Sequence, residues 1–428
     1  MDGDPAVEPE LDSFSLTFPL PYRVGFLFTL AVWGWGLNLH YLYLLKIDVP
    51  SLIRYPGRTS VHRVPHHFST YRLATVLSGL LGLSMLLFWL LTWRVPSRVI
   101  AFDWMPMTYL VAMVVVFLAP LRNLPSAGRR RFFSTLRRIC LGGIAEAQDG
   151  KFGDILLADV LTSYAKVLCD LYVSVCMFAT PGGSSTLRPD RECGGAVAVP
   201  ILLAVPSAIR FRQCVVEFLR VRRAPYREST GWGGQHLANA LKYSTAFPVI
   251  IAGAMQKGPA AASSDGGDAG PGAGAVAGAG AGAAPALSKA WLCAVLVNSL
   301  YSFYWDVTKD WDLTLFSGRR ERSSPHHPWA LRARLIFRPV NAYYVVILLD
   351  LALRCTWSVK LSARLDAYSR FEGGIFLMQL LEIFRRWVWI FLRTEAEWFR
   401  HNPPGLGADD ILMGSYQDDD DDDLDDDK

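Results

Sequence analysis

The sequence predicts an all-α fold, a polytopic membrane bundle of about nine or ten transmembrane helices. Hydrophobic residues make up 51% of the 428 residues and charged residues only 19%, which is the composition of a membrane protein rather than of a soluble enzyme. Several apolar runs are long enough to cross a bilayer, which takes about 20 helical residues. Most of the later runs carry charges at helical spacing, and these indicate a polar pathway through the bundle.

The first part of the chain, residues 22–150, is predicted to be scaffold. A polar lead, residues 1–21, precedes apolar runs at residues 24–45, 73–93 and 105–121, and none of these runs contains Asp, Glu, Lys or Arg. Intramembrane ionisable groups are the usual mark of a substrate pathway. We therefore expect these three spans only to support the bundle.

Residues 129–144 alternate basic and apolar residues at helical spacing. They predict either a helix that lies in the membrane interface or a short, distorted crossing. The basic segments 220–227 and 317–338 are expected in the cytosol, where Lys and Arg of short loops are retained. A crossing at 129–144 gives ten spans with both termini cytosolic; without it there are nine, and the N-terminus lies outside. Ten is the preferred count, and the C-terminus is cytosolic in both cases.

Two segments have a biased composition. Residues 257–287 are mostly Gly and Ala, which predicts a flexible loop on the non-cytosolic side. Residues 401–428 end in a run of Asp, which predicts a disordered, solvated tail.

The first charged span is residues 155–178. Asp159, Ser163, Lys166 and Asp170 occur at i, i+4, i+7 and i+11, so in one continuous helix they share a face about 60° wide. One interpretation is a self-neutralised ladder that holds helices together. A face toward a water-filled cavity is favoured, because four polar groups exceed what packing needs.

The last span, within residues 377–397, carries the most charge. A charge at the centre of a bilayer helix costs roughly 2.5–3.5 kcal/mol, so its ionised groups must face other helices or water. Arg385 is expected to point toward a different neighbour from the rest. The groups that share one stripe are Gln379, Glu382, Arg386, Arg393 and Glu397.

The spans at residues 237–255, 290–305 and 340–359 supply further candidates: Lys242, Asp306, Asp310, Asp350, Arg354 and Trp357. Arg recognises phosphate and carboxylate with two parallel hydrogen bonds, and Lys adds a point charge. A cavity that collects these cations would attract a small oxyanion. The carboxylates would keep binding weak enough for the anion to leave, as conduction requires.

The sequence contains none of the motifs of metalloproteases, serine hydrolases or P-loop proteins, so we expect no enzyme, no cofactor, no metal site and no nucleic-acid partner. A membrane hydrolase that pairs Asp159 with Asp170 is the disfavoured alternative. None of the seven cysteines has CxxC spacing. Those in apolar runs, Cys176 among them, are predicted to be small buried hydrophobes rather than disulfide or metal ligands.

Six blocks of sequence resemble one known family, in order and spacing. They read FGDILLADVLTSY, AIRFRQCVVEFLRVRR, HLANALKYSTAF, YSFYWDVTKDWDL, PVNAYYVVILLDLALRCTW and EIFRRWVWIFLRTEAEW. They are similar to the EXS domain, the membrane part of the eukaryotic phosphate exporters related to the xenotropic and polytropic retrovirus receptor. We assign residues 151–400 to this domain.

The resemblance implies a phosphate-conducting bundle formed by the last six helices. It places the phosphate pathway on Asp159, Lys242, Asp306, Asp310, Arg354, Trp357, Arg385 and Arg386, with only one of the two aspartates of the WDxxxDW block required. Ser163, Lys166, Asp170, Asp350, Glu382 and Arg393 are expected to support them.

The larger exporters carry a basic SPX domain that senses inositol pyrophosphates, whereas here about twenty residues precede the first span. The chain resembles instead the short fungal branch of the family, the "ER retention defective" proteins. This implies a Golgi membrane protein that returns phosphate from the lumen to the cytosol, and so supports recycling of glycosyltransferases and retention of ER proteins.

Two other functions stay open at this stage. One is a trafficking adaptor that binds Golgi glycosyltransferase tails or coat-associated receptors without transporting anything. The other is a phosphate exporter of the plasma membrane; the ER membrane is a further location. The partners expected are inorganic phosphate and the lipid bilayer, and the sequence leaves open whether the chain forms a homodimer.

Overall fold

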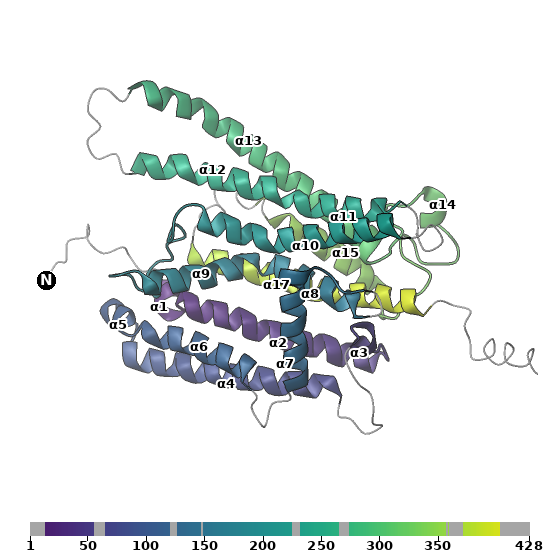
Figure 1. The fold of residues 1–428 in the computed structure, drawn as a ribbon, viewed down its shortest axis with the longest axis horizontal. Coiled ribbons are helices and arrows are strands. Elements are labelled where there is room, and N and C mark those ends of the chain that lie inside the picture. The colour runs from purple at the N-terminus through teal and green to yellow at the C-terminus, as the bar shows by residue number, and fades with distance from the viewer. Residues whose placement is uncertain are drawn as a thin grey trace, which may run out of the picture.

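The computed structural model describes residues 13–54, 65–119, 126–146, 149–224, 232–264, 274–356, 358 and 371–402. All regular elements in these residues are helical (Figure 1). In chain order they are α1 (Ser13–Thr17), α2 (Leu20–Leu44), α3 (Val49–Leu52), α4 (His66–Thr92), α5 (Pro96–Ala101), α6 (Trp104–Leu118), α7 (Ser126–Arg137), the π-helical η1 (Arg138–Gly142), α8 (Lys151–Ser163), α9 (Ala165–Ala179), α10 (Ala198–Arg223), α11 (Gly234–Ser244), α12 (Ala246–Ser264), α13 (Gly274–Trp305), the π-helical η3 (Asp306–Asp310), α14 (Arg319–Arg322), α15 (Asn341–Arg354) and α17 (Glu372–His401).

The long helices lie side by side along one direction (Figure 1). The three apolar runs predicted as scaffold form the helices α2, α4 and α6, which share a core that includes Leu27, Leu77 and Tyr109. The outer face of α4 exposes a row of leucines, Leu83 and Leu90 among them. A soluble monomer rarely exposes so large an apolar surface, whereas hydrocarbon tails would cover it.

Among the described helices, α4, α10 and residues 286–310 are both long and apolar enough to cross a membrane, and the pair α8 and α9 is a fourth if counted as one bent span. The last helix, α17, is 30 residues long but amphipathic. Several of its charged residues are buried against other helices, Arg385, Arg386 and Arg393 among them. This burial is what a charged transmembrane helix requires.

Two of the predicted spans are broken. The axes of α8 and α9 meet at 61° beside Tyr164, and α11 gives way to α12 at Thr245. Irregular backbone at membrane depth is tolerated where protein or a polar cavity surrounds it. In α13 the regular helix changes to the π-helical turn η3 at Asp306, a distortion that is frequent at functional sites.

The bundle has two chemically different ends. At the basic end, α10 finishes in Arg220, Arg222 and Arg223, and the arginine-rich α14 lies at the same end (Figure 1). The prediction that the two basic segments share one side is confirmed for these described parts. We call the other end the N-terminal end, because α1 lies there.

The orientation of α7 does not support a tenth crossing at residues 129–144. Helix α7 lies across the bundle rather than along it (Figure 1). Arg129 anchors it, since Nη1 donates to the carbonyl oxygens of Val116 and Ala119 at the end of α6, at 2.5 and 2.7 Å. Moreover, the Phe14 ring of α1 packs on Phe376 near the start of α17, with ring centroids 5.9 Å apart. The N-terminal helix is therefore at the opposite end from the finish of α17.

Two local expectations also fail. The Gly/Ala segment was expected to be a loop from residue 257 to 287, but α12 continues to Ser264 and α13 begins at Gly274, because alanine favours helix strongly enough to extend both spans. Cys176 was expected to be a buried thiol, but it forms a disulfide with Cys193. The acidic tail beyond residue 402 lies outside the described residues.

Candidate functional site

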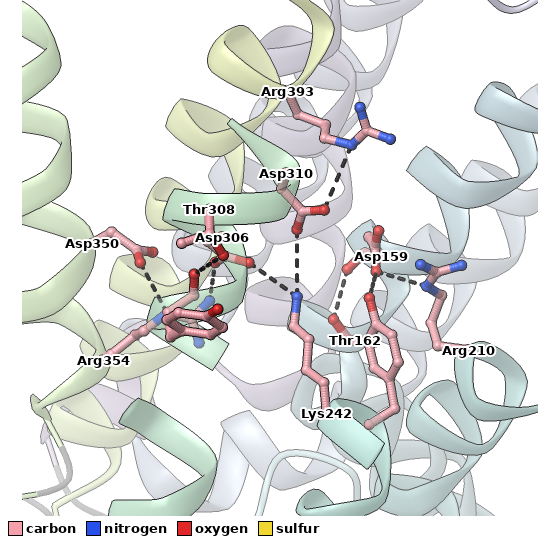
Figure 2. A network of polar contacts seen from close by, with 12 residues as sticks. Asp159, Thr162, Arg210, Lys242, Asp306, Thr308, Asp310, Asp350, Arg354 and Arg393 are labelled. Carbon is pink, nitrogen blue, oxygen red and sulfur yellow. Dashed lines mark hydrogen bonds and ion pairs between the residues drawn. The ribbon is translucent and has the colours of Figure 1, made fainter. Parts of the chain in front are cut away.

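An ion-pair network between α11 and η3 forms the middle of the candidate site (Figure 2). Lys242 Nζ donates to Asp306 Oδ1 at 3.0 Å, and the other carboxylate oxygen of Asp306 accepts from Arg354. Lys242 and Arg354 lie in the last turns of α11 and α15, where the helix dipole favours a cation. Asp306 is fully buried, and the two cations compensate its charge.

Both aspartates of the WDxxxDW block belong to the network. Lys242 Nζ is 3.4 Å from Asp310 Oδ2. Asp310 Oδ1 is also 3.8 Å from Arg393 Nε of α17. Asp310 therefore links Lys242, in the middle of the network, to Arg393 of α17 (Figure 2).

Asp159 of α8 holds a second group of contacts. Its Oδ1 accepts from Arg210 Nε at 2.8 Å and from the Tyr243 hydroxyl at 2.5 Å. Arg210 also donates to Gln213 at 2.6 Å, and its guanidinium lies 4.8 Å from the centre of the Tyr243 ring. Sequence reasoning missed Arg210; the signal was its place four residues after Pro206 within an apolar helix.

Arg385 joins α17 to α15. It donates to Asp350 Oδ1 at 2.9 Å and to both carboxylate oxygens of Glu382 at 2.6 and 3.0 Å. Asp350 in turn accepts from Arg354 Nε at 2.9 Å. The prediction that Arg385 points toward a different neighbour from the stripe is confirmed only for its contact with Asp350 of α15, because Arg385 also pairs with Glu382, a member of the stripe.

Arg386 is different from the other cations of the network. Its Nε donates to Ser163 Oγ at 3.0 Å and Nη2 to Thr162 Oγ1 at 3.3 Å, and it stacks 4.6 Å from the Trp389 ring centre. Within the described part of the chain, its buried Nη1 has no hydrogen-bond partner and its guanidinium no ion pair. Ser163, which accepts from Arg386, itself donates to Glu382 Oε1 at 2.7 Å, so Arg386 reaches this carboxylate only through a hydroxyl group. Its free Nη1 donor is available to an anionic ligand.

Three predicted residues are not placed in this network. Lys166 is exposed. Asp170 is buried, but it contacts Gln379 and Arg191 instead. The expected single face on residues 155–178 is wrong, because the 61° bend at Tyr164 separates Asp159 and Ser163 from both. Trp357 lies outside the described residues.

The network is close to electrically balanced. Its cations are Arg210, Lys242, Arg354, Arg385, Arg386 and Arg393, and its carboxylates are Asp159, Asp306, Asp310, Asp350 and Glu382. One further carboxylate, Glu397, is shared between Arg393 and Arg400. Such a site can attract an oxyanion without holding it tightly. In the part of the chain that the structure describes, no group of His, Cys, Asp and Glu could hold a metal ion.

The chain matches one known family and several known proteins. The profile of the EXS family matches residues 18–399. Over 398 residues the chain is 30% identical to Protein ERD1 homolog 1 of Schizosaccharomyces pombe, with 92% of this chain and 94% of that protein covered.

Longer relatives match over only part of their length. SPX and EXS domain-containing protein 1 of Dictyostelium discoideum is 25% identical over 91% of this chain and 38% of its own length. Solute carrier family 53 member 1 of Mus pahari is 24% identical over 75% of this chain and 43% of its own length.

Proposed function

Since the chain belongs to the EXS family, and is thus a multi-pass membrane protein, we propose that it is a transporter or channel for inorganic phosphate. The observation that carries this proposal is Arg386, a buried guanidinium that has hydroxyl partners but no carboxylate among the described residues. Phosphate would pair directly with this guanidinium and accept a hydrogen bond from the free Nη1 donor.

The surrounding carboxylates fit conduction better than storage. A phosphate bound at Arg386 would lie close to ion pairs that already satisfy Lys242, Arg354 and Arg385. In each ion pair, a phosphate oxygen can replace the carboxylate as the partner of the cation, so that no cation is left without an anionic partner. Binding of this compensated kind is weak enough for release, which a pathway needs.

We infer nine membrane crossings, of which the last six form the phosphate pathway: α8 with α9, α10, α11 with α12, α13 with η3, α15 and α17. The basic end is then cytosolic by its arginines, and so is the C-terminus. The Cys176–Cys193 disulfide ties the last turn of α9 to the segment before α10, and α9 ends at the N-terminal end (Figure 1). A disulfide persists in an oxidising compartment, which supports the same orientation.

We further propose a Golgi location, with phosphate moving from the lumen to the cytosol. The support is the similarity to ERD1 homologs over nearly the whole chain and the resemblance to short fungal EXS proteins. Luminal phosphate comes from glycosylation, after the nucleoside diphosphates released by sugar donors are hydrolysed. Its removal would support recycling of glycosyltransferases and retention of ER proteins.

The test is phosphate flux in proteoliposomes that contain the purified protein, Arg386→Ala or Lys166→Ala. Lys166 is the matched control, because it is a cation of the neighbouring bent span but exposed. We expect flux from the parent and from Lys166→Ala, and none from Arg386→Ala. Parental flux in Arg386→Ala would reject this pathway. A folded parent without flux would favour the trafficking-adaptor alternative.

A further inference from the structure

The polar stripe of α17 is longer than the central network. Glu372, Gln379, Arg386 and Arg393 follow one another at intervals of seven residues, and all four are buried. Seven residues make nearly two helical turns, so these side chains lie on one face with a drift of only about 20° per step. The stripe begins at Glu372, at the N-terminal end of the bundle, two steps before Arg386.

Glu372 is held by two arginines from other parts of the chain. Arg23 of α2 donates from Nη1 to Glu372 Oε2 at 2.8 Å. Arg191, in the segment between α9 and α10, donates to Oε1 at 2.8 Å and to Oε2 at 3.1 Å. A guanidinium that binds both oxygens of a carboxylate has the geometry that also suits two oxygens of a phosphate.

Polar side chains connect this cluster to the central network. Arg191 Nε lies 3.8 Å from Asp170 Oδ1, and Asp170 Oδ2 accepts from Gln379 Nε2 at 2.6 Å. The next residue of the stripe after Gln379 is Arg386. The distance along α17 from Glu372 to Arg386 is about 21 Å at 1.5 Å per residue. The Glu372 cluster and the central network around Arg386 are therefore two separate polar clusters on one face of the helix.

The cluster has one member that can move more easily than the others. The Arg191 side chain is 25% exposed, whereas Arg23 is 3% and Glu372 is 7% exposed. Arg191 lies two residues before Cys193, whose disulfide with Cys176 ties its segment to α9. The disulfide therefore limits how far Arg191 can travel from Glu372. Arg23 is fixed more firmly, since it also donates to Ser15 Oγ and to the Phe18 carbonyl, both at 2.7 Å.

We propose that Arg23 and Arg191 form a second oxyanion-binding site, at the N-terminal end of the pathway, in which the Glu372 carboxylate occupies the place of the transported anion. This inference rests on the proposed phosphate transport. Phosphate arriving at this end displaces Glu372 from both Arg191 and Arg23, is held by the two guanidinium groups, and passes along the α17 stripe to Arg386. When phosphate leaves, Glu372 returns and closes the site.

The experiment measures the phosphate concentration that gives half-maximal flux in proteoliposomes. Glu372→Gln removes the negative charge that competes with phosphate but keeps the shape of the side chain. The phosphate concentration that gives half-maximal flux should therefore fall several-fold. Arg191→Gln should raise it several-fold. Arg188→Gln is the matched control, because Arg188 is an exposed arginine of the same segment, and it should behave as the parent does.

A purely structural role of the cluster predicts a different result. If the cluster only holds helices together, Glu372→Gln and Arg191→Gln will lower the melting temperature and leave half-saturation at the parental value, which overturns the proposal. If Glu372→Gln fails to fold, Arg191→Gln still distinguishes the two outcomes, because Arg191 is partly exposed and its replacement disturbs the packing less. Failure of the transport function itself is distinguishable, because the parent would then show no flux at all.

A second measurement isolates binding from transport. In the Arg386→Ala background, where flux is expected to be absent, phosphate should still raise the melting temperature if the second site binds it. That increase should be lost when Arg191→Gln is added. An increase that Arg191→Gln does not alter would overturn the proposed site.

Discussion

Lys242 Nζ lies 3.0 Å from Asp306 Oδ1 and 3.4 Å from Asp310 Oδ2, although the aspartates are 64 and 68 residues away in the chain. One ammonium group thus joins the end of α11 to both ends of the π-helical turn η3. We predict that Lys242→Ala abolishes phosphate flux and lowers stability, because removing one partner of a buried pair costs about 3–5 kcal/mol. Flux assays and thermal unfolding would check this.

The control for Lys242→Ala is Lys309→Ala, since Lys309 is an exposed lysine of the same π-helical turn. Lys309→Ala should have the same phosphate flux and the same melting temperature as the parent. Adding Asp306→Asn to Lys242→Ala should recover part of the melting temperature but no flux. Near-parental flux in Lys242→Ala would remove this residue from the pathway.

Arg210 provides a test that the sequence alone did not suggest. Arg210→Gln leaves the buried Asp159 without its ion-pair partner. A hydrogen bond to a charged group contributes about 1.5–3 kcal/mol, so we expect flux to fall by about tenfold or more. Arg223→Gln, an exposed change at the end of the same helix, should have no effect. Equal flux in the two variants would make Arg210 a structural residue only.

Glu395 tests stability outside the pathway. Its carboxylate is fully buried, pairs with Arg332, and accepts from the Tyr343 hydroxyl at 2.5 Å and from the Ile336 amide at 2.6 Å. Glu395→Gln should therefore destabilise the fold by about 3–5 kcal/mol, with flux per folded molecule unchanged. Thermal unfolding of Glu395→Gln would measure this loss of stability, with Glu321→Gln, a change at an exposed residue, as the control. Identical melting temperatures of the two variants would contradict the prediction.

The disulfide allows a test of stability. Replacing Cys176 and Cys193 by serine opens a link between residues 17 positions apart, and a loop of about that size is worth about 3 kcal/mol. The melting temperature should fall, and a reducing agent should lower that of the parent to the same value. Cys140→Ser, at an exposed free cysteine, is the control. A parent insensitive to reductant would show that the pair is not oxidised.

Much of the fold was predictable because its determinants are local. A run of apolar residues long enough to cross a bilayer is visible without any partner, and α2, α4 and α6 appear where the runs lie. Charges inside such runs must be compensated by other helices. For that reason Asp159, Lys242, Asp306, Arg354, Arg385 and Arg386 could be chosen as candidates, and the structure brings them into one buried network.

What the sequence by itself determined is therefore which helices carry charge and which residues bear it. Tertiary structure alone decided which charges meet. Helical periodicity assumes an unbroken axis, and the 61° bend at Tyr164 moved Asp170 to the cluster of Arg191 and Glu372 and left Lys166 exposed. Only packing reveals that Asp159 pairs with Arg210 while Arg386 has no described carboxylate partner, because distances of a few ångströms between separate helices are not encoded in local spacing.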